Sequence, residues 1–360
     1  MSGPDDLFSH TVPEAHAKFV AACDVAGATT RVIEHPLSGP DGEPLHATVA
    51  RLGPDDARDV MLVISGTHGI EGYFGSAMQI DAMRRSRDLL PLDDHTAVVM
   101  VHLVNPWGTA WSSRENEDNV ELLRGHHFCH HPVPPNPIFD DFHETMGYGR
   151  ITSIDELLAT RGRAIELVKR HGLGSLMEAI AAGQGSQPDA ITWVGDGTPT
   201  WSKRLLDQVA AEHLGTAERL LVWDLHTAVG PPGETVVFHP YPPGSSDDEL
   251  FRAHFGELWP NPEGLDFYAW FGELCPHLTT RTLICEAGTE QLGPDDQYIF
   301  PLDVWIKLHG DRTDPAAAPH LARYRRFFYP ETDEWMSSVH AHFVPRWRHA
   351  LDLLAAPWPA

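Results

Sequence analysis

The sequence predicts a single-domain α/β fold built on a mixed, mostly parallel twisted sheet with helices on both faces. Short apolar runs of strand length alternate along the chain with segments whose apolar residues recur at helical spacing. That alternation is typical of strands joined by crossover helices. With 360 residues, 42% of them hydrophobic, the chain is also large and apolar enough to bury the core that such a sheet needs.

Five apolar runs are expected to be strands. Residues 60–65 (VMLVIS) and 97–104 (AVVMVHLV) are apolar at nearly every position, as in strands that are buried on both faces. Three later runs complete the set, at 220–225, 235–238 and 282–285. These runs are expected to form the sheet.

Three segments are expected to be helical. Residues 73–90 carry apolar residues on one side and arginines near the end, which suits a helix C-terminus. Residues 155–182 are helical in pattern with a Gly-Leu-Gly break, and residues 323–347 with a Tyr-Pro interruption. No linker is long enough to require a second domain. Residues 1–45 are expected to be an N-terminal extension packed on a domain of residues 46–360.

Charge and composition exclude several classes of function. The 26 basic and 51 acidic residues give a net charge of −25, which argues against a nucleic-acid binder and against docking on anionic membranes. No signal peptide is recognisable, and no apolar run approaches about 18 residues, so a cytoplasmic protein is expected. The four cysteines form no CxxC pair, so we expect free thiols and no cysteine-rich zinc site.

The first candidate site is the stretch VISGTHGIEG, which places His68 and Glu71 between a buried strand and a helix. Sites in α/β sheets gather at the carboxyl ends of strands. Imidazole and carboxylate are both good zinc ligands, and catalytic zinc is commonly held by two histidines, one glutamate and a water. Taken alone, the pair also fits a loop histidine and a solvated glutamate.

A third metal ligand is available in the same context. His226 ends the apolar run LLVWDLH, and Asp224 lies two residues earlier, on the same side of the strand. Asp224 is positioned to accept a hydrogen bond from the ring N–H of a zinc-binding histidine, so that it would hold the ligand without touching the metal. The alternative is a histidine satisfied by hydrogen bonds at a strand end. Two strand-end histidines together with the nearby Glu71 favour the metal site.

Charged residues for catalysis follow the same rule. Glu286 emerges from the apolar run TLIC, where a carboxylate costs several kcal/mol unless it is paired or functional. It is the candidate base for a metal-activated water, against a structural ion pair. Arg114 and Arg124 follow the second predicted strand. Near a zinc ion, one arginine could stabilise an oxyanion and a second could bind a substrate carboxylate; surface ion pairs are the alternative for both.

Together these residues resemble the zinc carboxypeptidase (metallocarboxypeptidase) superfamily, most closely its bacterial branch of uncharacterised cytoplasmic members. The likeness lies in the His-x-x-Glu pair, an Asn-Pro-x-Gly turn, the arginines and the strand-end His and Glu. It extends to SGTHGIEGYFGSA, GDGTPTWSKRLL, LHTAVG, CEAGTE and FFYPETDEW. The resemblance implies a carboxypeptidase-like fold over residues 46–360 and one Zn²⁺ per chain.

The resemblance also implies roles for single residues. The zinc ligands would be His68, Glu71 and His226, the general base Glu286 and the oxyanion group Arg114. Substrate binding would fall to Asn105, to Arg124 and to a tyrosine that closes over the substrate, for which Tyr268 and Tyr298 are both candidates.

The sequence departs from the family pattern at one position. The family's Asp-Leu-Asn-Arg segment reads Glu121-Leu-Leu-Arg124 here, so the asparagine that assists carboxylate binding is Leu123. Leucine neither donates nor accepts a hydrogen bond, so a carboxylate bound there loses one partner. The substrate pocket is therefore expected to differ from that of an ordinary carboxypeptidase.

These observations predict a zinc-dependent hydrolase that cleaves an amide bond with metal-activated water. The expected substrate is a small peptide or amide that carries a carboxylate, as for a metallocarboxypeptidase. An acyl-amino-acid or small-molecule amidohydrolase in a biosynthetic pathway is the alternative, and a catalytically silent metal- or ligand-binding relative is a remote one. The histidine-rich segment 126–131 (HHFCHH) is expected to be a loop beside the cleft rather than a second metal site. The oligomeric state stays open.

Overall fold

A computed structural model describes residues 6–259, 265–291 and 299–359. Within these ranges the strands form one seven-stranded sheet in the order β1-β2-β4-β3-β5-β7-β6. Strands β4, β3, β5 and β7 pair in parallel at the centre, whereas β1, β2 and β6 join antiparallel at the two sides. The strands are β1 Thr29–Ser38, β2 Pro44–Leu52, β3 Asp59–Ser65, β4 Thr96–His102, β5 Arg219–Ala228, β6 Thr235–Phe238 and β7 Thr279–Gly288.

The sheet has an apolar core on each face. Met61 and Val63 of β3 belong to one core cluster, and Leu62 and Ile64 to the other, because successive side chains of a strand point to opposite faces. The first core is covered by α1 (Val12–Ala26), α2 (Gly72–Arg84) and α15 (Asp333–Ala355). The second is covered by α10 (Trp201–His213) and α12 (Trp270–Leu274). A strand covered on both sides must be apolar along its buried length, as residues 60–64 of β3 are.

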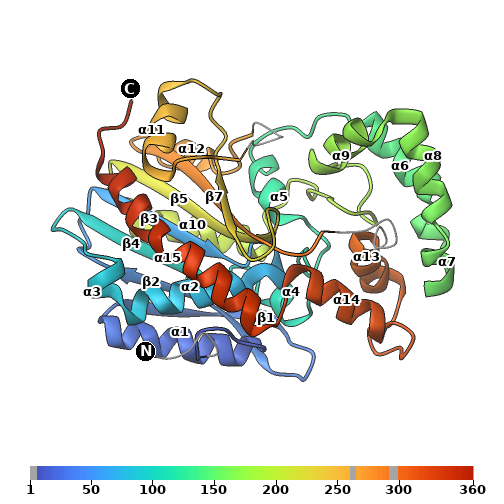
Figure 1. Ribbon diagram of the computed structural model, residues 1–360, viewed down its shortest axis with the longest axis horizontal. Helices are drawn as coiled ribbons and strands as arrows, with labels where there is room; N and C mark the ends of the chain where they lie inside the picture. The colour runs from blue at the N-terminus through green and yellow to red at the C-terminus, as the bar shows by residue number, and fades with distance from the viewer. Residues whose placement is uncertain (1–5, 260–264, 292–298, 360) are drawn as a thin grey trace.

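A separate group of helices lies beside the sheet, at the right of Figure 1. It contains α6 (Pro137–Met146), α7 (Ile154–Leu158), α8 (Arg161–His171) and α9 (Leu173–Ala181), which share a separate apolar cluster with α13 (Ile299–His309). Gly172, with φ of 81°, ends α8, as the Gly-Leu-Gly break predicted. The remaining helices are α3 Ser86–Leu89, α4 Pro106–Ala110, α5 Leu122–Phe128, α11 Ser246–Phe255 and α14 Ala318–Phe328, with the short 3₁₀ turns η2 Gly69–Glu71 and η3 Tyr148–Arg150.

The predicted fold class is confirmed, with helices on both faces of a mixed sheet. Within the sheet, parallel pairing joins the four central strands. All five predicted strands are present, and the helix expected over 73–90 is split into α2 and α3 at Arg85. The sequence analysis did not identify α1, β1 or β2. The division of the chain after residue 45 stays a prediction, and β2 runs across that position.

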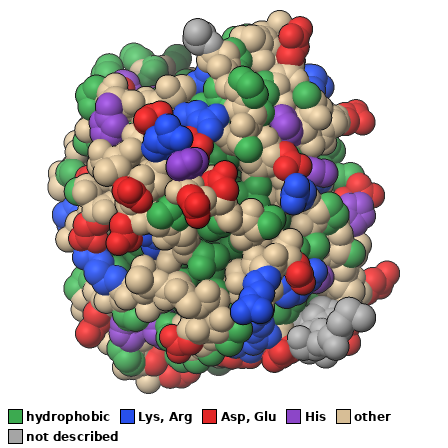
Figure 2. Space-filling view, turned by 90° about the vertical axis from the view of Figure 1, so that its left-hand side faces the viewer, with side chains coloured by type: hydrophobic (Ala, Val, Ile, Leu, Met, Phe, Trp, Pro, Cys, Tyr) green, Lys and Arg blue, Asp and Glu red, His purple; other side chains and the backbone are tan. Residues whose placement is uncertain are grey.

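Two further observations bear on the expected class of protein. The four cysteines all lie in described residues and are free thiols, as expected. No helix of the described ranges is long and apolar enough to cross a membrane. On the face shown in Figure 2, acidic side chains are spread among basic ones, and no large basic patch is seen there.

Candidate metal centre

The turn that follows β3 holds the first two candidate ligands. His68 precedes the 3₁₀ turn η2, and Glu71 ends it, so both side chains leave one turn of backbone. Gly69 lies between them, and a Cβ atom there would come within 2.2 Å of the Gly108 carbonyl carbon. Only glycine therefore allows this turn to pack so closely against the segment after β4.

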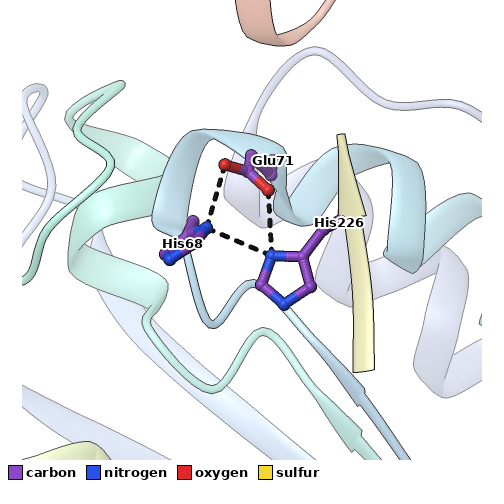
Figure 3. Close-up of side chains that lie close together, drawn as sticks. All are labelled: His68, Glu71 and His226. Carbon is purple, nitrogen blue, oxygen red and sulfur yellow. Dashed lines mark hydrogen bonds and ion pairs between the residues drawn. The ribbon is translucent and has the colours of Figure 1, made fainter. Parts of the chain in front are cut away.

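The third candidate ligand, His226, reaches the same point from β5 (Figure 3). His68 Nδ1 lies 3.0 Å from Glu71 Oε1, His226 Nδ1 lies 3.0 Å from Glu71 Oε2, and the two Nδ1 atoms are 3.1 Å apart. Zinc–nitrogen bonds of about 2.0–2.1 Å imply ligand atoms about 3.3 Å apart in a tetrahedral site. The three side chains are thus spaced as the ligands of one small cation would be, and they form a group that could hold a metal ion.

Each ring nitrogen that faces away from this point meets a buried carboxylate. His226 Nε2 lies 2.6 Å from Asp224 Oδ2, and His68 Nε2 contacts Glu121 Oε1. Carboxylates in this position orient a metal-binding histidine and fix which nitrogen carries the proton. Both Nδ1 atoms are then left with their lone pairs directed at Glu71, an arrangement that only a proton or a cation can hold together.

Without a metal ion, a proton would have to serve that purpose. Burial would lower the pKa of His226, but the charges of Asp224 and Glu71 outweigh it and raise the pKa well above its ordinary value. Burial would raise the pKa of Glu71, but His68 and His226 outweigh it and lower the pKa. The donor set therefore has a strong affinity for positive charge, and a bound metal ion would displace the proton.

Asp224 is itself fixed by two hydroxyl groups. Thr67 Oγ1 donates to Asp224 Oδ1 at 3.0 Å, and the Tyr268 hydroxyl donates to Oδ2 at 2.6 Å. All three side chains are buried. The structure places Tyr268 in the core with its hydroxyl bonded to Asp224. The other candidate for the closing tyrosine, Tyr298, lies outside the described residues.

Glu286 lies next to His226 on the neighbouring strand. The two residues are direct partners in the parallel pairing of β5 and β7, so their side chains point to the same face of the sheet. Glu286 Oε2 accepts a hydrogen bond from the Val229 backbone N–H at 3.3 Å. Burial, together with the charge of Glu71, raises the pKa of Glu286 well above its ordinary value. The carboxyl group therefore binds a proton more readily than an exposed glutamate does.

Arg114 lies on the other side of the ligand group. Its Nε atom is 3.9 Å from Glu71 Oε1, its Nη1 atom 3.2 Å from Glu115 Oε1 and its Nη2 atom 3.4 Å from Glu121 Oε1. The side chain is 11% exposed. Burial would lower the pKa of Arg114, but Glu121, Glu115 and Glu71 outweigh it and raise the pKa. A permanent positive charge thus faces the candidate ligands.

Glu121 links this arginine to the second one, and the sequence analysis gave it no role. Its Oε2 atom lies 3.1 Å from Arg124 Nη1 and also accepts the Arg124 backbone N–H at 3.0 Å. Burial would raise the pKa of Glu121, but Arg124, Arg114 and His68 outweigh it and hold the pKa well below its ordinary value. In the sequence, Glu121 could have been noticed because it stands where the zinc carboxypeptidase pattern Asp-Leu-Asn-Arg has its aspartate.

The remaining predicted substrate residues lie in different surroundings. Leu123 is buried in the core cluster of α10 and α12. Asn105 caps α4, with its Oδ1 atom accepting the Gly108 N–H at 2.9 Å. Arg124 also stacks against Phe267, with 5.4 Å between the guanidinium carbon and the ring centre. Their roles in binding a substrate stay predictions.

The histidine-rich segment 126–131 begins within α5 rather than in a loop. His126 is buried, and burial with the nearby Lys203 charge lowers its pKa to about 3. His130 and His131 lie 3.5 and 3.1 Å from Glu273. Among the described residues, the group of His68, Glu71 and His226 is the one whose ligand atoms gather closely enough for a metal ion.

Among the solved structures that are similar to this chain are a fibrinolysis inhibitor and a carboxypeptidase. Bovine thrombin-activatable fibrinolysis inhibitor, in complex with tick carboxypeptidase inhibitor, is 12% identical with a TM-score of 0.46, over 97% of this chain and 99% of that one. Carboxypeptidase A from Helicoverpa armigera is 13% identical with a TM-score of 0.41, over 89% and 75% of the two chains.

A protein of the succinylglutamate desuccinylase/aspartoacylase family from Shewanella amazonensis SB2B is also similar. It is 16% identical with a TM-score of 0.36, over 78% of this chain and 72% of that one.

Comparison with curated proteins gives no match. The family described as "Protein of unknown function (DUF2817)" matches residues 8–342. Because this match spans most of the sequence, the chain belongs to the DUF2817 family.

Proposed function

We propose that the protein is a zinc-dependent hydrolase that cleaves an amide bond, acting as a metallocarboxypeptidase on a peptide or peptide-like small substrate. The observation that carries the proposal is the convergence of His68, Glu71 and His226, with Nδ1 atoms 3.1 Å apart and a carboxylate at each opposite ring nitrogen. A catalytic zinc site commonly uses two histidines and one glutamate.

The zinc ion would be held by these three side chains, one ion per chain. Bound there, it would supply Lewis-acid chemistry, polarising a substrate carbonyl and promoting the ionisation of water. Asp224 and Glu121 keep the two imidazole rings in the orientation that presents Nδ1 to the metal.

Glu286 acts as the general base and then as the general acid. Its raised pKa suits a group that takes a proton from water and returns it to the leaving nitrogen. The Val229 N–H keeps one of its oxygens in place. Arg114 directs its guanidinium group to the oxyanion that forms when the amide carbonyl is attacked. One such contact contributes about 2.7–4 kcal/mol to the transition state.

A second candidate is a small-molecule amide hydrolase whose substrate is not an ordinary peptide C-terminus. Leu123 is in the apolar core, and Arg124 already forms an ion pair with the buried Glu121. A substrate carboxylate at this place would compete with Glu121 for the arginine and gain little. The metal side of the proposal is the same for both candidates.

The two candidates are separated by a substrate screen with the zinc-loaded protein. Short peptides, their carboxy-amidated analogues and N-acylated amino acids are compared at equal concentration. Preference for a free C-terminus supports the carboxypeptidase, and equal or better cleavage of amidated analogues supports the second candidate. If the wild-type protein is fully folded and binds no zinc, the proposal is wrong for both.

A further inference from the structure

A buried carboxylate outside the candidate metal centre holds the segment that carries Arg114. Asp303 lies on α13 and is fully buried. It accepts a hydrogen bond from Ser113 Oγ at 2.6 Å, contacts the Arg312 guanidinium group and lies 4.0 Å from Lys307 Nζ. A buried charge is tolerated only when it is paired and hydrogen-bonded, so Asp303, Ser113 and Arg312 are expected to hold one fixed geometry.

The segment of residues 111–117, called here the Arg114 loop, is attached to this part of the chain at three points. Besides the Ser113 contact, Arg312 Nη1 donates to the Trp111 carbonyl at 2.8 Å and Lys307 Nζ donates to the Asn116 carbonyl at 3.0 Å. All three donors or acceptors outside the loop lie between residues 303 and 312. The position of the loop therefore depends on α13 and the turn that follows it, together with α14, where the Tyr324 hydroxyl accepts the Arg114 backbone N–H at 3.0 Å and Arg325 Nη1 donates to Ser112 Oγ at 3.2 Å.

On its inner side the Arg114 loop binds the metal turn directly. The Gly69 N–H donates to the Arg114 carbonyl at 3.0 Å, and the Ile70 N–H donates to the Ser113 carbonyl at 2.9 Å. These two amides belong to the residues between His68 and Glu71. Ser113 thus bonds through its side chain to Asp303 and through its carbonyl to the metal turn.

We propose that Asp303 is a positioning residue, which sets the place of both the Arg114 guanidinium group and the His68–Glu71 turn through its bond to Ser113. Asp303 does not itself contact His68, Glu71 or His226. Its effect on catalysis rests on the function proposed above, whereas its effect on the geometry of the metal turn does not.

The test uses the full chain with Asp303→Asn and Ser113→Ala, which remove opposite ends of the same bond. Asp248→Asn is the matched control, since Asp248 is a buried carboxylate paired with Arg252 at 3.0 Å on a different helix. Amide hydrogen exchange is followed in peptides that contain Gly69 and Ile70, and zinc affinity is measured by competition with a chelator.

In both the Asp303→Asn and the Ser113→Ala variant, the amides of Gly69 and Ile70 should exchange faster. Both variants should also bind zinc more weakly. Each effect should be roughly tenfold. If the wild type cleaves an amide, kcat should fall more than KM changes. Unchanged exchange and zinc affinity in both variants would overturn the proposal. So would faster exchange spread equally over all core peptides, which is the sign of a merely structural role. Exchange is measurable even if the protein binds no zinc, so failure of the proposed function is told apart from failure of this inference.

Discussion

The candidate centre has two sides of different construction. The metal side, His68, Glu71 and His226, comes from the carboxyl ends of the parallel strands β3 and β5. The arginine side, Arg114, Glu121 and Arg124, comes from a loop and a short helix. On the metal side, the paired strand β5 places His226, and the short turn that follows β3 places His68 and Glu71. On the arginine side, the side chains fix one another through ion pairs around Glu121.

This difference indicates where each kind of specificity resides. A ligand on a paired strand, as His226 is, cannot move without disturbing the sheet, and ligands on a turn directly after a strand start from a fixed point, which suits the geometry that a metal ion needs. Groups held by loops and ion pairs are easier to exchange for others without loss of the fold. We expect the metal chemistry to be robust and the choice of substrate to reside on the arginine side.

The largest effect is expected from a break in the metal side. His68→Ala should abolish stoichiometric zinc binding and all hydrolysis, because one of three protein ligands is lost. Metal analysis of the purified protein measures this directly. His342→Ala, at an exposed histidine, serves as the control and should retain one zinc per chain. Full zinc content in the His68→Ala variant would remove that residue from the ligand set.

The next effect separates binding of the metal from its use. Glu286→Gln keeps the shape of the side chain and its bond from the Val229 N–H, but removes the group that transfers protons. We expect full zinc content and a fall in kcat of about 10²–10⁴-fold. Unchanged turnover would exclude Glu286 as the base. Loss of zinc in this variant would show that Glu286 has a role in the metal site itself.

A smaller effect is expected where the two sides meet. Glu121→Gln leaves an oxygen to accept from His68 but removes the charge that holds Arg114 and Arg124. Zinc affinity should fall by about 10–100-fold, the usual cost of losing a partner of a metal-binding histidine. Asp224→Asn should weaken zinc similarly but leave the arginines in place. If the two variants have the same substrate preference, the two sides are not separable in the way described.

The smallest effect on the centre is expected from Leu123→Asn, which introduces the asparagine of the zinc carboxypeptidase pattern at that position. Because Leu123 is 6% exposed in the apolar core, the new amide should lower the free energy of unfolding by about 2–4 kcal/mol. Zinc content and substrate preference should not change. Urea unfolding and the substrate screen check both. A gain of activity on free C-termini would place residue 123 in the pocket and favour the carboxypeptidase.

The sequence analysis located the central strands and the metal side because both follow from short-range patterns. A buried parallel strand is continuously apolar, and a polar residue at its end stands out, as His226 and Glu286 do. Strand β1 was missed because most of its residues are exposed and it has no such run. Glu121 was missed because its contact with His68 joins residues 53 positions apart, and no local pattern reports such a pairing. The link from Asp303 to Ser113, across 190 positions, was out of reach for the same reason.

Gly69 has a consequence for how this protein tolerates mutation. Gly69 has a hydrogen where other residues have a side chain. A Cβ atom in that place would lie 2.2 Å from the Gly108 carbonyl carbon. In a saturation library selected for zinc binding, position 69 should accept no substitution at all, whereas exposed Val229 beside Glu286 should accept many. The least tolerant position of the metal turn would then be a residue without any functional group. Positions that tolerate substitution should instead be sought on the arginine side, in the loop and the short helix that carry Arg114, Glu121 and Arg124.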